Sequence, residues 1–282
     1  DRLMSRGLGD VYKRQLNGGA HAASNVDVQE FMVMPHGFDS FEEGLRAGVE
    51  TYHSLKAELK KDGLLGGIGD EGGFAPNLPT NEDGLKYMVR AIEGAGYSTE
   101  EIGIALDVAS TEFLKDDGYH MDGKVLSSDD LVEMYGGWLD AYPILSIEDG
   151  FGEDDWRGWS AFTKAYGHRV QTVGDDLFVT QSERLAQGIE LGAANAMLVK
   201  VNQVGTVTET LEAMDLASTN GMNNVVSHRS GESEDVTIAD FAVGTRAGQI
   251  KTGAPARSDR VAKYNQLLRI AEDVHEYRSP FN

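Results

Sequence analysis

The stretch Leu145-Ser146-Ile147-Glu148-Asp149-Gly150 is a short apolar run that ends in two carboxylates and a glycine. On its own it predicts a buried strand that runs into a turn. Other short apolar runs of the chain also end at a charged or titratable residue. These residues are Asp107, Asp175, Lys200, His228 and Lys251. The stretch is therefore one member of a series, and the series decides the fold.

The members of this series are regularly spaced. When Glu148 is included, successive members of the series are separated by 41, 27, 25, 28 and 23 residues. About 25 to 40 residues accommodate one strand, one helix and their loops. The longest interval contains an acidic insertion over residues 116–124, which we expect to lie on the surface. The spacing therefore indicates repeated βα units.

Repeated βα units imply parallel strands joined by right-handed crossovers. No Gly-rich dinucleotide-binding motif follows any predicted strand, which favours a closed barrel over an open doubly wound sheet. The predicted fold is α/β, a TIM-like (β/α)8 barrel whose strand ends converge on one site. Length alone, at 282 residues, would also allow two smaller domains.

Composition narrows the classes of partner. Hydrophobic residues make up 40% of the chain without a long uncharged apolar run, which predicts a globular protein with no membrane span. The formal net charge of −21, from 46 acidic and 25 basic side chains, disfavours nucleic acid and anionic membranes, because the field of the protein repels both. The absence of cysteine excludes disulfides, thiolate metal ligands and a cysteine nucleophile.

Residues 1–15 differ from the rest of the chain. They are rich in basic side chains in an otherwise acidic protein, and they show no apolar period. We therefore expect a tail, either foreign to the native gene or an ordinary poorly ordered terminus, and we exclude it from the site. The barrel domain is expected to span residues 16–282.

The segment before residue 107 is less regular than the later units. Residues 26–35 predict a strand in which Glu30 is a polar interruption. Two helices are then expected in succession, over residues 40–63 and around residues 85–92, because each carries an apolar face of helical period. The chain thus begins differently from a simple alternation of strands and helices.

Two glycine-rich segments lie in the same region. Asn17-Gly18-Gly19-Ala20-His21 places glycines where a backbone turns or approaches a group closely, and for His21 alone a structural role is favoured over a functional one. Gly67–Asn77 carries Glu71 and is either a loop that brings a carboxylate to a ligand or a solvated turn. The sequence leaves these two readings of the second segment nearly even.

Three of the strand-end residues are carboxylates, namely Asp107, Glu148 and Asp175. Barrel enzymes carry their catalytic residues at the strand ends, so the three are expected to lie close together. Three acids at such distances repel one another unless a cation lies between them. Their all-oxygen donor set suits a hard ion such as Mg²⁺ better than Zn²⁺. Any one of them alone could instead be a helix cap or a loop residue.

Basic side chains continue the series. Lys200 would project into the same cavity, where partial desolvation beside a divalent cation would lower its pKa toward that of a general base. A salt bridge to one of the acids is the alternative. Arg229 and Lys251 add fixed positive charge, as an anionic phosphate or carboxylate substrate requires. Together the groups indicate removal of a proton next to a carboxylate, with a metal that stabilises the resulting dianion.

The motifs of the chain resemble those of the enolase family over essentially all of residues 16–282. They are Leu16-Asn17-Gly18-Gly19-Ala20-His21, Gly69-Asp70-Glu71-Gly72-Gly73, Ser146-Ile147-Glu148-Asp149-Gly150, Met197-Leu198-Val199-Lys200-Val201-Asn202-Gln203-Val204-Gly205 and Ser227-His228-Arg229-Ser230-Gly231-Glu232. The resemblance implies a barrel that starts with two strands and two helices. It also implies the glycolytic lyase reaction, in which 2-phosphoglycerate gives phosphoenolpyruvate and water with the help of Mg²⁺.

The same resemblance implies roles for individual residues. The Mg²⁺ ligands that it implies are Asp107, Glu148 and Asp175. Lys200 corresponds to the base that takes the C2 proton, and Glu71, supported by Glu30, to the acid that assists departure of the C3 hydroxyl. The implied substrate contacts are His21, Glu30, His228, Arg229, Ser230 and Lys251, with Arg229 mainly on the phosphate and Lys251 on the carboxylate.

For full-length family members, the resemblance implies a cytoplasmic homodimer with an N-terminal α+β domain that supplies a loop for a second Mg²⁺. Nothing in this sequence corresponds to that domain, and we expect an incomplete first strand and a chain that is weakly active or inactive alone. One alternative is a dehydratase or racemase of the superfamily that acts on another carboxylate, which the Gly69–Gly73 loop and the His228-Arg229-Ser230 run disfavour. The other is a non-catalytic barrel fragment that acts as a binding surface.

Overall fold

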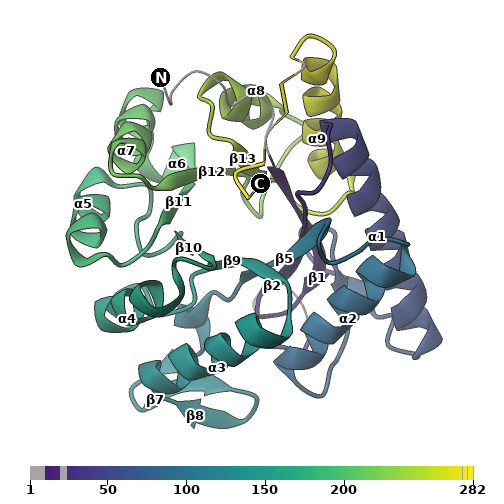
Figure 1. Cartoon of the computed structure of the whole chain (residues 1–282), viewed down its shortest axis with the longest axis horizontal. Coiled ribbons are helices and arrows are strands. Elements are labelled where there is room, and N and C mark those ends of the chain that lie inside the picture. Colours follow the sequence, from purple (N-terminus) through teal and green to yellow (C-terminus); the bar gives the residue numbers. More distant parts are fainter. Residues whose placement is uncertain (1–9, 20–23, 275, 278, 282) are drawn as a thin grey trace.

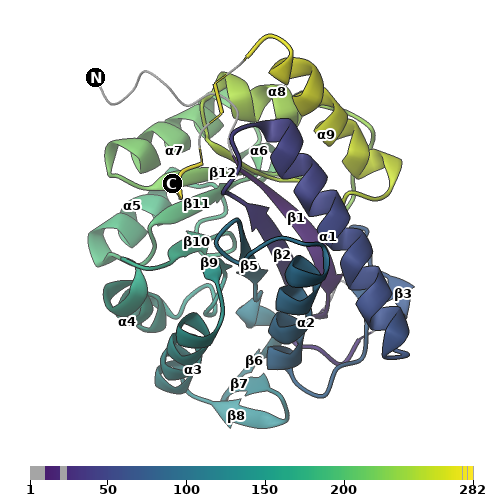
Figure 2. The ribbon, with the colours of Figure 1, turned by 45° about the vertical axis from the view of Figure 1, so that its right-hand side comes forward.

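The computed structural model describes residues 10–19, 24–274, 276–277 and 279–281. Within these residues, eight strands close into a barrel that helices surround (Figures 1 and 2). The barrel strands are β1 (Asp10–Asn17), β2 (Glu30–Pro35), β5 (Ile102–Asp107), β9 (Ile144–Glu148), β10 (Gln171–Gly174), β11 (Ala196–Val199), β12 (Asn223–Ser227) and β13 (Gln249–Lys251). The α/β barrel predicted from the spacing of the strand ends is confirmed.

Strand direction explains how the barrel begins and closes. β1 pairs in parallel with β13, where Tyr12 lies opposite Lys251, and this pairing closes the ring. β2 runs antiparallel to both of its neighbours, β1 and β5. Its first residue, Glu30, therefore lies opposite Asp107, the last residue of β5. A residue that begins a strand is in this way brought to the rim where the parallel strands end.

Two helices follow β2 before the next barrel strand, as the sequence predicts. The helices of the described residues are α1 (Phe41–Lys61), α2 (Asn81–Gly94), α3 (Ser128–Ala141), α4 (Trp156–Tyr166), α5 (Ser182–Leu191), α6 (Val201–Val204), α7 (Val207–Thr219), α8 (Thr237–Gly244) and α9 (Ser258–Ala271). Ser40 caps α1, and Thr80 forms a capping box with Asp83 at the start of α2. Among the described helices, none combines the length and the apolar character that crossing a membrane requires.

Short strands complete the fold outside the ring. The expected surface insertion is a small antiparallel sheet of β6 (Leu114–Lys115), β7 (Gly118–Met121) and β8 (Lys124–Leu126), preceded by the 3-10 helix Ser110–Phe113. β3 (Gly67–Ile68) and β4 (Phe74–Ala75) form a hairpin, and β4 also pairs with Leu16 of β1. The glycine-rich segment that carries Glu71 is therefore fixed to the barrel.

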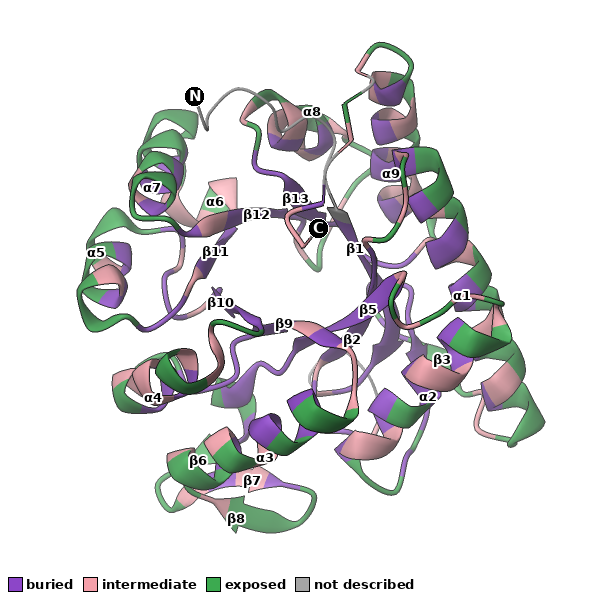
Figure 3. Ribbon diagram, viewed as in Figure 1, coloured by how far each residue is buried: buried purple, intermediate pink, exposed green. Residues whose placement is uncertain are grey.

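The core has two layers. Figure 3 shows that the barrel strands are buried and that the helices around them have exposed outer faces. The larger layer lies between strands and helices and includes Leu55, Leu106 and Trp159. The smaller layer fills the inside of the ring with Met32, Leu198 and similar side chains. Because the interior is filled, substrate access is confined to the rim of the barrel.

The boundary predicted between tail and domain is wrong for residues 10–15. These residues form most of β1, and Lys13, Arg14 and Gln15 are each at most 2% exposed. A ring that lacked this strand would leave unpaired N–H and C=O groups on β13 and β2, so pairing outweighs the unfavourable composition. The first strand is thus present in the described residues. Residues 1–9 lie outside them, and the foreign origin of the tail stays a prediction.

Candidate active site at the carboxyl ends of the strands

The strand-end series converges on the rim of the barrel, as predicted. Asp107, Glu148 and Lys251 are the last residues of β5, β9 and β13, and the other three members directly follow β10, β11 and β12. A cavity of about 200 Å³ opens there. Its lining consists of Gln29, Glu30, Glu71, Asp107, Ala109, Glu112, Asp175, Asp176, Lys200, Ser227, His228, Arg229, Ser230 and Lys251.

Lys251 joins three acids at the bottom of this site. Its Nζ donates to Asp107 Oδ2 at 2.8 Å and to both carboxylate oxygens of Glu148 at 2.8 Å, and it lies 3.3 Å from Glu30 Oε1. Burial lowers the pKa of Lys251, but the charges of Asp107 and Glu148 outweigh it and raise that pKa. Burial and the charge of Asp107 raise the pKa of Glu148 to about 8. The acids therefore exceed the positive charge available to them.

Lys200 forms an ion pair with Asp175 Oδ2. The structure therefore contains the salt bridge that the sequence allowed for Lys200 as the alternative to a general base. The second oxygen of Asp175, Oδ1, is buried and has no hydrogen-bond partner among the described residues. A buried carboxylate oxygen without a donor is costly unless a cation or a ligand group contacts it.

The predicted metal ligands lie in two groups in the structure. Asp107 and Glu148 converge on Lys251, whereas Asp175 contacts Lys200. The ammonium between Asp107 and Glu148 marks a position where these oxygens already surround a cation. With the partnerless oxygen of Asp175, this all-carboxylate set fits a hard divalent ion.

A second acidic group adjoins the first. One oxygen each of Asp149, Asp175 and Asp176 lies within 4.8 Å of the others. However, Asp149 Oδ1 accepts the backbone N–H of Asp175 at 2.9 Å, and Oδ2 accepts that of Asp176 at 2.8 Å. Asp149 therefore uses both oxygens to hold the backbone that carries Asp175, which suits a supporting role better than that of a ligand.

Glu71 lies at the centre of a second cluster and is 2% exposed. Its Oε2 is 2.6 Å from His228 Nε2 and 2.9 Å from the Arg14 guanidinium, and its Oε1 accepts a hydrogen bond from Ser230 Oγ at 2.9 Å. The backbone carbonyl of Glu71 accepts the N–H of Ala254 at 3.0 Å. A solvated turn is therefore excluded, because Glu71 is buried at the cavity. That this loop brings its carboxylate to a ligand stays a prediction.

The charges of this cluster follow from burial. Burial lowers the pKa of His228 to about 4, so the imidazole is neutral at neutral pH. Burial alone would raise the pKa of Glu71, but the contact with His228 and the charge of Arg14 outweigh burial and hold the pKa of Glu71 well below its usual value. Because the imidazole is neutral at neutral pH, the guanidinium of Arg14 and the ammonium of Lys251 are the cations that keep Glu71 ionised there.

The remaining predicted contacts are only partly placed. Arg229 lies at the cavity, where its guanidinium donates to Asn202 Oδ1 at 2.6 Å and its backbone N–H to Glu232 Oε1 at 3.0 Å. Glu30 contacts both Arg14 and Lys251. The prediction for His21 lies outside the described residues.

Sequence reasoning missed two cations of this site. Arg14 was set aside with the tail, although it contacts Glu30 and Glu71. Arg260, in the first turn of α9, is fully buried and contacts His228. Its signal was weak, because Arg260 and Lys263 lie one turn apart on the face that also buries Tyr264, which looks like an ordinary apolar stripe.

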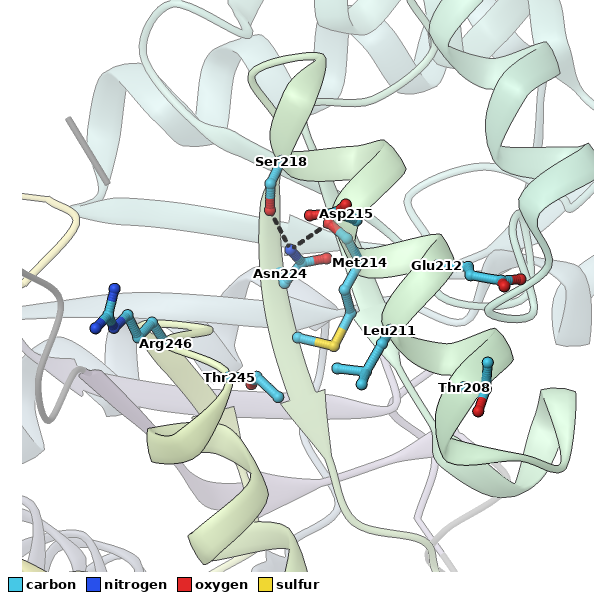
Figure 4. Close-up of a pocket in the computed structure, with 9 residues that line it drawn as sticks. All are labelled: Thr208, Leu211, Glu212, Met214, Asp215, Ser218, Asn224, Thr245 and Arg246. Atoms are coloured by element: carbon cyan, nitrogen blue, oxygen red, sulfur yellow. Dashed lines mark hydrogen bonds between the residues drawn. The ribbon is translucent and has the colours of Figure 1, made fainter. Parts of the chain in front are cut away.

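A larger cavity lies elsewhere, on the outer surface between α7 and α8 (Figure 4). It measures about 400 Å³ and is lined by Thr208, Leu211, Glu212, Met214, Asp215, Ser218, Asn224, Thr245 and Arg246. Asn224 donates there to Met214 O and to Ser218 Oγ, which ties β12 to α7. Size does not make it the active site, since the smaller cavity is the one lined by five strand-end residues, Asp107, Asp175, Lys200, His228 and Lys251.

A closed α/β barrel with acids and lysines at the carboxyl ends of its strands belongs to the TIM-barrel class of enzymes, whose active sites lie at that rim. Residues 12–279 match the family described as enolase, C-terminal TIM barrel domain. The chain belongs to this family. Membership indicates an enzyme of lyase type.

Proposed function

We propose that the chain catalyses the glycolytic dehydration of 2-phosphoglycerate to phosphoenolpyruvate. The observation that carries the proposal is that Lys200 and Glu71, a candidate base and a candidate acid from distant parts of the chain, line the same small cavity as Arg229. Removal of water from adjacent carbons needs one group at each carbon and a cation for the substrate anion. Family membership over residues 12–279 supports the same reaction.

The proposed cofactor is Mg²⁺. Asp107, Glu148 and Asp175 would hold it, since their buried oxygens form an all-carboxylate donor set with too little positive charge of its own. When bound, the cation would stabilise the negative charge that develops on the substrate carboxylate as the C2 proton leaves. Lys251 adds a fixed ammonium beside the same acids and is the proposed contact for that carboxylate.

The proposed steps use two side chains of the cavity. Lys200 Nζ, as the neutral amine, takes the C2 proton, and the electron pair of the C–H bond remains on the substrate. That pair then forms the C2–C3 double bond, while the C3 hydroxyl departs with a proton from Glu71 as water. Glu71 is ionised in the free chain, but the negative charge of a bound phosphate favours its protonated form.

Substrate binding is assigned to the basic and polar groups around the cavity. Arg229 is the proposed phosphate contact, because its guanidinium can bind two phosphate oxygens together. We propose that Ser230 and His228, which both contact Glu71, border the substrate. Glu30 is proposed to border it as well. His21 is retained as a proposed contact from the family resemblance alone.

The proposal extends to the setting of the reaction. It includes a small-molecule substrate, a cytoplasmic location, no nucleic-acid partner and a homodimer in full-length family members. The resemblance implies an N-terminal domain that completes the site in full-length family members.

The test follows the ultraviolet absorbance of phosphoenolpyruvate with millimolar Mg²⁺, for the chain alone and after addition of the N-terminal domain of a full-length family member. Lys200→Ala should abolish turnover and exchange of the C2 proton with solvent. Lys164→Ala, which removes an exposed lysine of α4, is the matched control and should retain both. Absence of turnover under both conditions would overturn the proposal, and C2 exchange in Lys200→Ala would refute the base assignment.

A further inference from the structure

The buried guanidinium of Arg260 contacts three consecutive residues of the site. Arg260 lies in the first turn of α9 and is 0% exposed. It contacts His228 Nδ1, donates through NH1 to the carbonyl of Arg229 at 2.7 Å, and donates through NH2 to the carbonyl of Ser230 at 2.7 Å. These three residues are among those assigned above to substrate binding.

We propose that Arg260 is a positioning residue that holds His228 as a neutral donor toward Glu71 and fixes the backbone from which Arg229 and Ser230 reach the substrate. The assignment of this role to the reaction rests on the proposed function. The contacts themselves, and the state of His228 that they impose, do not depend on the identity of the substrate.

The state of His228 follows from donor and acceptor chemistry. A guanidinium has only N–H donors and is always charged, so the ring nitrogen that faces it must be an acceptor. His228 Nδ1 therefore carries the lone pair, and the single ring proton is on Nε2. Nε2 lies 2.6 Å from Glu71 Oε2, so the proton is carried by the ring nitrogen that contacts the candidate acid. A second proton on Nδ1 would bring an N–H against the N–H of Arg260.

The charged groups around His228 act in opposite directions. Glu71 favours the imidazolium, whereas Arg260 and Arg14 disfavour it, and burial disfavours it further. Loss of Arg260 would remove one of the two cations and leave Nδ1 without its donor. His228 would then accept a second proton more readily and hold the carboxylate of Glu71 as an ion pair.

An arginine is required by geometry, since one planar fork reaches two backbone carbonyls and a ring nitrogen. A lysine could keep the charge but would not reproduce the fork. The site also leaves room for the fork, because a Cβ on Gly253 would lie 2.9 Å from Arg260 Cδ and 3.1 Å from His228 Cε1. Gly253 has a φ of +86°, which also favours glycine.

The experiment titrates His228 by NMR in ¹⁵N-histidine-labelled protein, with the resonance assigned by its loss in His228→Gln. In the parent chain, His228 should remain the neutral Nε2–H tautomer from pH 7 down to pH 5. Arg260→Leu should raise the protonation constant of His228 at least about tenfold. Arg260→Lys keeps a cation beside the ring, so it should titrate like the parent while the KM for 2-phosphoglycerate rises about tenfold.

Controls separate positioning from folding and from the reaction itself. Arg269→Gln, which changes an exposed arginine of the same helix, should alter neither readout. If Arg260→Leu does not fold by circular dichroism, Arg260→Gln takes its place, because it removes the charge and retains an amide donor. A folded uncharged variant in which His228 titrates as in the parent would overturn the proposal. The titration does not require catalytic turnover, so its result can be interpreted even if the lyase assay fails.

Discussion

Glu30, the first residue of β2, lies directly opposite Asp107, the last residue of β5, and Lys251 Nζ lies 3.3 Å from the first and 2.8 Å from the second. The antiparallel direction of β2 creates this juxtaposition. It concentrates buried negative charge at one side of the rim, where the ammonium of Lys251 contacts three carboxylates, the third being that of Glu148. The stability of the site without a metal therefore depends on this lysine.

Replacement of Lys251 by methionine should destabilise the metal-free chain by about 3–5 kcal/mol, because it leaves buried carboxylates without their cation. If Asp107 and Glu148 bind Mg²⁺, millimolar Mg²⁺ should recover much of this loss and should stabilise the variant more than the parent. Urea unfolding with and without Mg²⁺ measures both effects.

Lys263→Met provides the matched control. Lys263 is equally buried and lies 2.8 Å from Glu232 Oε2, a carboxylate that is not among the proposed ligands. It should show a similar loss of stability that Mg²⁺ does not recover. Equal recovery in both variants would show that the acids around Lys251 do not bind the metal.

His228 should make stability depend on pH. Its pKa is about 4 in the folded chain and 6.5 for the ordinary side chain, so the unfolded chain binds the proton first as the pH falls. Its contribution is therefore present in full above pH 6.5 and is lost between pH 6.5 and pH 4, by roughly 3 kcal/mol at most. Glu71, Arg14 and Arg260 are the charged groups that face it and set this difference.

Other groups change the pH profile in the opposite sense. Burial raises the pKa of Glu148 to about 8 and that of Asp176 to about 6. Protonation of these two acids therefore stabilises the folded chain as the pH falls. The measurement is therefore the difference between the parent and His228→Gln in urea unfolding at several pH values. That difference should shrink from pH 7 to pH 4, and a constant difference would contradict the neutral state of His228.

The sequence predicts the rim of the barrel better than its charge pairing. Asp107 and Lys200 were found because a βα unit has a nearly fixed length and each strand ends in the site. Glu30 begins its strand, so only the antiparallel start of the family barrel explains its place. Arg260 could not be found from periodicity, since a buried cation on a helix face is identified only by the carbonyls and the ring that it contacts in three dimensions.

Tertiary constraints also outweighed local composition. Residues 10–15 include Lys13, Arg14 and Gln15, an unfavourable run for a buried strand, yet ring closure pairs the segment with β13 and β2. Likewise, the three acids predicted to share a metal pair with lysines in the metal-free chain. Asp107 and Glu148 contact Lys251, and Asp175 contacts Lys200, because each acid pairs with the nearest cation. Sequence position therefore predicts which groups meet at the rim, and the structure shows which of them pair.

Asp149 should control metal affinity without contacting the metal. Its two oxygens accept the N–H groups of Asp175 and Asp176 at 2.9 and 2.8 Å, and its φ of 44° lies in the left-handed region, which asparagine also tolerates. In Asp149→Asn the backbone of residue 149 is preserved, but the amide NH₂ meets one of the two N–H donors. The turn that carries Asp175 should shift, and Mg²⁺ should bind about tenfold more weakly by calorimetry.

Asp154→Asn makes the same change of charge on a side chain that is 77% exposed, so it should leave the affinity unchanged. If both variants bind Mg²⁺ with the same affinity, Asp149 stabilises only the loop and has no effect on the metal site.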